Sequence, residues 1–233
     1  MELTVITSVF NSELFLDHFF QDIKRQTIFE DCQFLFLDAN STDNSRQMIL
    51  EQCLRHKNIQ YCPAGNRNIY ETWNLGVFLS DTEFLTNWNT DDRRVPKSLE
   101  KQVNILKNNP HLDLSYGKTL WVDVPNKNVE DCDYHNQTPC FPATIELMLQ
   151  FNSPHCLPVW RKSMHDRFGY FDDSFFSAGD YEMWMRALSR GSQFGMLDKV
   201  IGAYYRNPKG ISSNPENLDR AVAEVMKIRK LYK

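Results

Sequence analysis

Two adjacent carboxylates, Asp91 and Asp92, follow the apolar segment Phe84–Trp88 and could hold a divalent metal ion. Consecutive residues of a strand point to opposite faces, so both can serve one site only where the strand ends and the chain turns. Arg93 and Pro96 indicate such a turn. One carboxylate could then bind Mg²⁺ or Mn²⁺ together with substrate phosphates, while the other accepts hydrogen bonds from a ribose. The alternative is a solvated turn in which Asp92 caps the next helix.

A third carboxylate, Asp180, lies at the predicted start of a helix. Tyr181 and Trp184 fall on one face of this helix and are expected in the core, and Ser177 can cap it. The helix dipole would stabilise Asp180 as a carboxylate, which suits a general base at the mouth of a helix. An ordinary helix-start residue is the alternative.

A basic loop at Tyr204–Ser212 could bind phosphate, because it combines Arg206, Lys209 and a flexible Gly210. An ordinary basic surface loop explains these residues equally well.

Asn11, Asp38 and Asp91 each come just after a predicted strand. Open parallel sheets bind ligands beyond the carboxyl ends of their strands, so we expect these side chains to meet at one edge. Each of them alone could instead cap a turn or a helix.

Apolar strands alternate with amphipathic helices, which predicts one α/β domain over residues 1–233 with a mostly parallel sheet covered on both faces. The expected strands are Leu3–Val9, Phe34–Leu37, Ile59–Cys62, Phe84–Trp88, Leu112–Leu120, Leu157–Trp160 and Phe194–Ile201. The expected helices include Phe15–Ile23, Met48–Leu54, Tyr70–Leu79, Pro96–Leu106, Thr144–Gln150, Asp180–Arg190 and Asn217–Leu231. The polar segment Val122–Thr138 is expected to form a long loop or a hairpin insertion.

The composition narrows the class of protein. Hydrophobic residues make up 42% of the 233 residues, which is enough for a sizeable core. The net charge of -4 argues against nucleic acid as the main partner. No apolar run approaches the roughly 18 residues of a membrane span, and the first residues do not resemble a signal peptide. We therefore expect a cytoplasmic protein without a transmembrane segment, and leave peripheral association with a membrane open.

The six cysteines form no CxxC pair, and we expect reduced thiols. Zinc could bind at Cys132, His135 and Cys140, with His155 and Cys156 further on, but the spacing of these residues matches no standard zinc pattern. Ordinary loop and core residues are the favoured interpretation.

Six segments between about residue 3 and about residue 213 form an ordered set of motifs: Thr7-Ser8-Val9-Phe10-Asn11, Asp38-Ala39-Asn40-Ser41-Thr42-Asp43, Asn68-Ile69-Tyr70-Glu71-Thr72-Trp73-Asn74-Leu75-Gly76, Asn89-Thr90-Asp91-Asp92, Phe168-Gly169-Tyr170-Phe171-Asp172, and Gly179-Asp180 followed by Trp184-Met185-Arg186. This set resembles the family 2 glycosyltransferases of the GT-A fold. Each motif alone is loose, and their order makes the resemblance specific.

The resemblance implies inverting transfer of a sugar from a nucleotide-diphosphate sugar, expected to be a UDP-sugar, to a hydroxyl of a glycan or glycoconjugate. Asp180 would be the base, and Mn²⁺ or Mg²⁺ would bind at Asp91 and Asp92. Residues 1–120 would bind the donor, residues 121–213 the acceptor, and residues 214–233 would form a C-terminal helix. The implied nucleotide-binding residues are Thr7, Val9, Asn11, Asp38, Asn74, Asp91 and Arg206. Further candidates on the acceptor side are His155, Asp172, Glu182 and Trp184.

Three positions depart from the family pattern. Ala39 replaces an aspartate that often bonds the base, so nucleotide choice stays open. Asn89 replaces the first aspartate of the metal motif, and Asn207 stands near the place of a frequent metal- or phosphate-binding histidine, for which His155 could compensate.

The loop after the first strand, residues 8–12, contains no glycine, which argues against a sugar nucleotidyltransferase and a nicotinamide dehydrogenase. A non-catalytic carbohydrate- or nucleotide-binding module of the same fold is the remaining alternative.

Overall fold

The first two strands are apolar along their length because helices cover both of their faces. In the computed structural model, which describes residues 1–233, Val5 and Phe36 face one layer of helices, whereas Ile6 and Leu37 face the other. Side chains of a strand alternate between its faces, so a strand buried on both sides reads as a continuous apolar run.

The helices and strands follow one another in strand–helix alternation through the first half of the chain. The strands are β1 (Leu3–Val9), β2 (Cys32–Asp38), β3 (Ile59–Pro63), β4 (Phe84–Asn87), β5 (Arg93–Arg94), β6 (Leu114–Val122), β7 (Val159–Arg161) and β8 (Phe194–Tyr205). The α-helices are α1 (Glu13–Lys24), α2 (Ser45–Arg55), α3 (Ile69–Leu79), α4 (Ser98–Asn108), α5 (Ile145–Met148), α6 (Met164–Phe168), α7 (Gly179–Ser189) and α8 (Leu218–Leu231). Short 3₁₀ helices lie at Phe29–Asp31, Val129–Asp131 and Pro215–Asn217.

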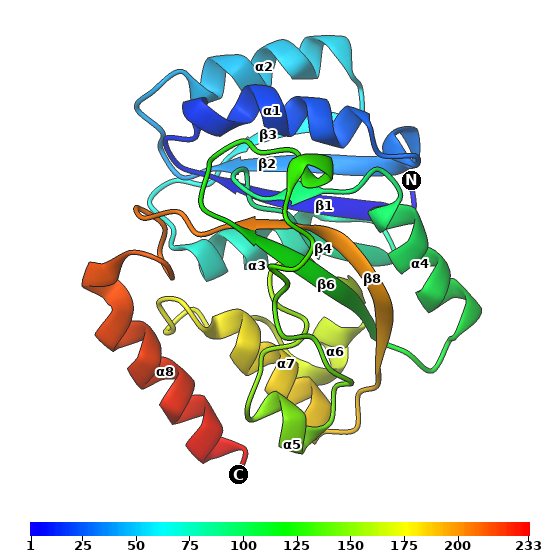
Figure 1. Cartoon of the computed structure of the whole chain (residues 1–233). Coiled ribbons are helices and arrows are strands. Elements are labelled where there is room, and N and C mark those ends of the chain that lie inside the picture. The colour runs from blue at the N-terminus through cyan, green and yellow to red at the C-terminus, as the bar shows by residue number, and fades with distance from the viewer.

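The strands form one sheet in the order β3-β2-β1-β4-β7-β6-β8-β5. Strands β3, β2, β1 and β4 are parallel, β7 is antiparallel to both of its neighbours, and β8 is parallel to β6. Helices α1, α2 and α4 pack on one face, and α3 and α5 to α8 lie on the other side (Figure 1). The predicted fold class, a single α/β domain with a mostly parallel sheet covered on both faces, is confirmed.

Helix α3 packs directly on β1 through Gly76. A Cβ at this position would lie 2.5 Å from Cγ2 of Ile6, so only glycine allows this approach. Asn68 starts the helix by accepting from the backbone of Tyr70 and Glu71, and the Glu71 carboxylate accepts the Asn68 N–H. This capping box fixes the loop between β3 and α3.

The boundaries differ from the predicted ones in several places. Helix α4 begins at Ser98, so Pro96 lies before the helix rather than in its first turn. Arg93–Arg94 pairs as a short strand with β8, and β8 itself extends to Tyr205. Neither β5 nor α6 was predicted, because two and five residues are too few to show a periodic pattern.

The predicted long loop at residues 122–138 folds back along β6. Leu120 forms an antiparallel bridge with Gln137, and the Trp121 N–H donates to the Asn136 carbonyl. Val129 and Cys132 of this loop pack in a small apolar cluster with Tyr205 and neighbouring residues.

All six cysteines are free, and no group of three or more His, Cys, Asp or Glu residues gathers where it could hold a metal ion. Cys132 donates to the Asn128 carbonyl and is part of the small apolar cluster, while Cys140 packs at the edge of a larger one. None of the helices combines the length and apolar character that crossing a membrane requires.

Candidate active site

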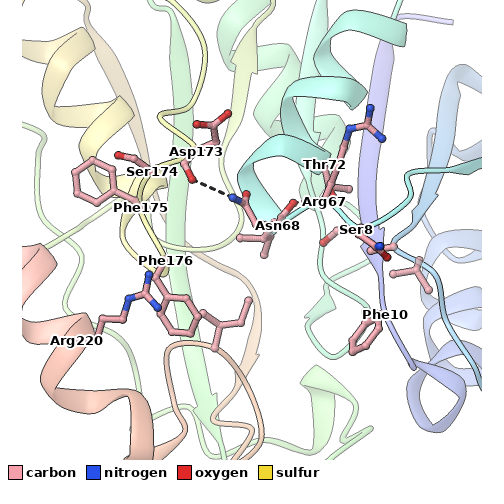
Figure 2. Close-up of a pocket in the computed structure, with 15 residues that line it drawn as sticks. Ser8, Phe10, Arg67, Asn68, Thr72, Asp173, Ser174, Phe175, Phe176 and Arg220 are labelled. Carbon is pink, nitrogen blue, oxygen red and sulfur yellow. Dashed lines mark hydrogen bonds between the residues drawn. The ribbon is translucent and has the colours of Figure 1, made fainter.

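A cavity of about 490 Å³ lies at the carboxyl ends of β1, β2 and β3, where the parallel arrangement predicts a ligand site (Figure 2). Its wall also includes the segment before α7 and one residue of α8. The lining residues are Ser8, Val9, Phe10, Ala39, Asn66, Arg67, Asn68, Ile69, Thr72, Asp173, Ser174, Phe175, Phe176, Ile211 and Arg220.

A larger cleft of about 1020 Å³ adjoins this cavity and shares five lining residues with it, Ser8, Phe10, Ile69, Phe176 and Ile211. Asp91 after β4 and Asp180 in α7 both line the cleft, and they are the only carboxylates that do so. Asp91 and Asp180 are 89 positions apart in the chain, and both of their carboxylates line the same cleft.

The two neighbouring aspartates separate at a tight turn after β4. The Asp92 N–H donates to the Asn89 carbonyl at 3.1 Å, and the Trp88 indole N–H donates to the Asp92 carbonyl at 3.1 Å. Arg93 Nη1 donates to the carbonyls of Thr90 and Asp92, at 2.9 Å and 2.7 Å. These bonds fix the backbone on both sides of Asp91 and direct its side chain into the cleft.

Asp91 is half-buried, and its Oδ2 accepts a hydrogen bond from Asn207 Nδ2 at 3.1 Å. Burial raises the pKa of Asp91, although the bond from Asn207 acts in the opposite direction. Asn89 also lines the cleft, and its Oδ1 is buried without a hydrogen-bond partner. The Asp91 carboxylate and the unpartnered amide oxygen of Asn89 are both oxygen ligands of the kind that hard divalent cations prefer.

Asp92 has no exposed surface and does not line the cleft, in contrast to its expected role beside Asp91. Its Oδ1 accepts the Tyr205 backbone N–H at 3.3 Å, and Asn89 Nδ2 lies 3.4 Å from its Oδ2. Burial raises the pKa of Asp92 well above its usual range. In this structure Asp92 holds the end of β8 against the turn.

Asp180 occupies the first turn of α7 and is partly exposed to the cleft. Burial raises the pKa of Asp180 to about 6, while hydrogen bonds from the Tyr181 backbone and Asn152 act against this shift. Asn152 Nδ2 lies 3.4 Å from Asp180 Oδ2. A carboxylate with this pKa is mostly charged at neutral pH and still basic enough to accept a proton.

His155 also lines the cleft and has a positive φ of 48°, which is uncommon outside glycine. Its ring packs edge-on against Tyr204, with ring centroids 4.8 Å apart. Burial lowers the pKa of His155 to about 4, so the imidazole is neutral at physiological pH.

The predicted nucleotide-binding residues divide into two groups. Val9 lines the first cavity and Asn11 lines the cleft, where Asn11 Oδ1 accepts the Thr42 N–H at 2.8 Å. Thr7, Asp38 and Asn74 line neither space.

These three residues instead support the walls of the site. Thr7 is fully buried, and Asp38 accepts hydrogen bonds from the Tyr61 hydroxyl at 2.9 Å and the Ser41 N–H at 2.9 Å. Asn74 exchanges two hydrogen bonds with the backbone of Phe171 and so ties α3 to the segment before α7.

Arg206 lines neither space and forms an exposed ion pair with Asp123 at 2.6 Å. In this structure Arg206 is therefore an ordinary basic surface residue, which was the alternative to phosphate binding. Lys209 and Gly210 of the same loop do line the cleft.

Three candidates of the acceptor side also lie outside the cleft. Glu182 is buried and accepts hydrogen bonds from Arg186 at 2.8 Å and from the Tyr232 hydroxyl at 2.7 Å. Asp172 is exposed and accepts the Ser174 N–H at 3.0 Å.

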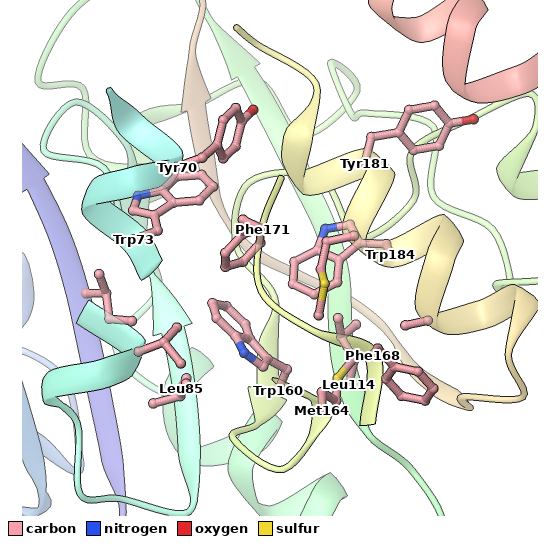
Figure 3. Close-up of a cluster of buried hydrophobic side chains, with 14 of the residues drawn as sticks. Tyr70, Trp73, Leu85, Leu114, Trp160, Met164, Phe168, Phe171, Tyr181 and Trp184 are labelled. Atoms are coloured by element: carbon pink, nitrogen blue, oxygen red, sulfur yellow. The ribbon is translucent and has the colours of Figure 1, made fainter. Parts of the chain in front are cut away.

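The third, Trp184, belongs to an aromatic cluster beneath the site (Figure 3). Its ring centroid lies 5.3 Å from that of Trp160 and 5.7 Å from that of Phe171. Packing of this density holds α7, and hence Asp180, in a fixed place.

Several residues of the site escaped the sequence analysis. Asn66 and Arg67 follow β3, and the rule applied to Asn11 and Asp38 would have found them at the carboxyl end of a strand. Asn152 and Arg220 come from irregular chain and from α8, and no local pattern marks them.

The family model of glycosyl transferase family 2 matches residues 4–168, which is more than half of the chain. The chain belongs to glycosyl transferase family 2. An uncharacterised glycosyltransferase of Haemophilus influenzae is 26% identical to this family 2 chain over 161 residues, covering 68% of this chain and 58% of the relative. Another from Methanocaldococcus jannaschii is 22% identical over 233 residues, covering 99% of this chain and 76% of the relative.

Solved structures share the fold of this family 2 chain. TarS 1-349 of S. aureus in complex with UDP-GlcNAc superposes with a TM-score of 0.76 at 18% identity, covering 100% of this chain and 66% of TarS 1-349. The mannosyltransferase PcManGT of Pyrobaculum calidifontis, solved with GDP-Man and Mn²⁺, gives a TM-score of 0.69 at 14% identity, covering 97% of this chain and 64% of PcManGT. The family 2 chain thus spans about two thirds or less of the length of these structures and of the Haemophilus relative.

Proposed function

We propose that the chain catalyses inverting transfer of a sugar from a nucleotide-diphosphate sugar to a hydroxyl of a glycan or glycoconjugate. The observation that carries this proposal is the meeting of Asp91 and Asp180 in one cleft, next to a cavity at the strand ends. A single displacement needs charge compensation at the leaving diphosphate and a base at the acceptor hydroxyl. Two carboxylates from separate segments can serve these two places.

The nucleoside of the donor fits the cavity of about 490 Å³, a volume within the usual range of small-molecule sites. UDP is the expected nucleotide, and relatives of the same fold were solved with UDP-GlcNAc and with GDP-Man. The Ala39 side chain offers the base no hydrogen bond, so recognition of the base depends on backbone groups near Val9 and on Asn66, Arg67 and Asn68, which line the same cavity.

A divalent cation, Mn²⁺ or Mg²⁺, fits the oxygen groups at the end of β4. Asp91 would hold such a cation through its carboxylate and Asn89 through its unpartnered Oδ1. When bound, the cation offsets the negative charge that develops on the leaving diphosphate. Asp92 supports this turn from the interior.

Asp180 accepts the proton of the acceptor hydroxyl as the new C–O bond forms at the anomeric carbon and the bond to the diphosphate breaks. Asn152 holds one carboxylate oxygen, and the aromatic cluster around Trp184 holds the helix. Since the attack and the departure occur on opposite faces of the sugar, one displacement inverts the anomeric configuration. No protein nucleophile is required.

The proposal is tested by incubating the protein with UDP-sugars and GDP-mannose, Mn²⁺, and a set of glycan acceptors. We expect nucleotide release that depends on the acceptor, with a product of inverted anomeric configuration by NMR. Asp180→Asn should abolish most of this transfer, and the matched change Asp172→Asn, outside the cleft, should not. Nucleotide binding without any transfer would instead support a non-catalytic module of this fold.

A further inference from the structure

The segment that leads into α7 is held by a carboxylate from the C-terminal helix. Glu224 Oε1 accepts the Phe176 N–H at 2.6 Å, and Glu224 Oε2 accepts the N–H groups of Ser177 at 2.8 Å and Ala178 at 3.1 Å. The Ser177 hydroxyl also donates to Oε2, at 3.3 Å. We call residues 176–178 the entry segment of α7.

Glu224 binds the backbone N–H groups of the N-cap residue Ala178 and of the two residues before it, so it holds the chain as it enters α7. Ala178 occupies the N-cap position of α7 and has no side chain that can accept a hydrogen bond, and Ser177, the predicted cap, bonds to Glu224 instead. Backbone N–H groups at the start of a helix attract negative charge. Glu224 supplies that charge from a helix that follows 46 positions later in the chain.

The opposite side of the same helix start is fixed by Tyr70 of α3. A Cβ at Gly179 would lie 2.9 Å from the Tyr70 ring, so α7 begins in direct contact with that ring. Glu224 therefore holds the entry segment and Tyr70 contacts Gly179, and Asp180 is the next residue after both contacts.

Helix α8 has other contacts with the domain as well: Arg229 Nη2 donates to the Gln150 carbonyl at 2.8 Å, and Lys227 lies over the Phe175 ring at 4.8 Å. Ile228 is its only buried residue, and the remaining contacts include Arg220 over the Phe176 ring at 4.0 Å. The same helix lines the cleft with Val222 and Met226, which are 52% and 57% exposed. One carboxylate thus connects the wall of the cleft to the helix that carries the proposed base.

We propose that Glu224 is a positioning residue for transfer, holding the entry segment so that Asp180 faces the acceptor hydroxyl in the cleft. The inference rests on the proposed function, because it assigns Asp180 as the base. Glu224 itself lines neither cavity and acts through α7.

Glu224→Gln keeps the size of the side chain but replaces one carboxylate oxygen by an NH₂ group. This group then faces backbone N–H groups of the entry segment, to which it cannot bond. We expect the transfer rate to fall roughly 10- to 100-fold with an unchanged KM for the donor, as for a misplaced catalytic group. Asp219→Asn removes the same charge from an exposed residue in the first turn of α8 whose side chain forms no hydrogen bond or ion pair, and it should leave the transfer rate unchanged.

The double variant Asp180→Asn/Glu224→Gln separates positioning from general structural support. If Glu224 acts through Asp180, its substitution adds no further loss once Asp180 is changed. Losses that multiply in the double variant, or a full rate in Glu224→Gln, would overturn the inference. A full rate in Asp180→Asn would overturn the proposed function itself.

Hydrogen exchange gives a readout that does not require turnover. In Glu224→Gln we expect faster exchange of the amides of residues 176–181, with the rest of the sheet and Asp219→Asn unchanged. Unchanged exchange at these amides would overturn the inference whether or not transfer is detected.

Discussion

Replacing Asp180 by Asn should inactivate the protein and stabilise it at the same time. The amide keeps the shape of the carboxylate, and its one oxygen can still accept a hydrogen bond of the kind that reaches the carboxylate from the Tyr181 backbone or Asn152. It cannot accept a proton, so transfer should fall by roughly 10²–10⁴-fold, the usual contribution of a positioned base.

The gain in stability follows from the burial of the charge. Burial raises the pKa of Asp180 from 3.8 to about 6, so keeping this carboxylate charged in the folded state at pH 7 costs about 3 kcal/mol of stability. The folded pKa lies above the unfolded one, and the wild-type protein therefore loses stability as the pH rises through about 4 to about 6. The asparagine does not titrate and avoids this loss.

Thermal unfolding of both proteins between about pH 3.5 and about pH 7.5, with transfer measured on the same samples, checks this prediction. The variant should match the wild type at the acidic end and exceed it at neutral pH, by at most about 3 kcal/mol. A variant that is less stable by about 0.5–2 kcal/mol and still active would show that Asp180 only starts the helix.

Further outcomes follow from the same contacts. The wild-type transfer rate should fall about tenfold between about pH 7 and about pH 5 as Asp180 becomes protonated, and a rate that stays flat over this range would contradict its role. Asp91→Asn should abolish the Mn²⁺-dependent binding of UDP, whereas Asp92→Asn, a change in the interior, should retain it; calorimetry of both variants decides this. Arg206→Ala should leave UDP affinity unchanged by calorimetry, because its partner is Asp123. Asn68→Ala should lower stability in thermal unfolding by about 0.5–2 kcal/mol through loss of the α3 cap.

The sheet, the place of Asp91 after a strand and the place of Asp180 at a helix start could be predicted because each depends on a local pattern. Strands β1 and β2 are continuous apolar runs, and the carboxyl ends of such strands gather at one edge. Helix α7 shows its buried face through Tyr181 and Trp184, which places Asp180 in its first turn.

The side-chain directions depend on partners that no local pattern reveals. Asp92 turns inward because the Tyr205 N–H, 113 positions later, binds its carboxylate. Arg206 turns outward to Asp123, 83 positions earlier. Glu224, rather than Ser177, holds the start of α7. Each of these outcomes required the tertiary structure.

Calorimetric titration of UDP with Mn²⁺ and with EDTA, on the wild type, Asp91→Asn and Asp180→Asn, tests the central claim most directly because it needs no acceptor. That claim is that two carboxylates of one cleft serve two separate steps. We predict binding that requires Mn²⁺ in the wild type and in Asp180→Asn, and loss of that binding in Asp91→Asn. Equal affinity with Mn²⁺ and with EDTA, or equal loss in both variants, would contradict the division of roles.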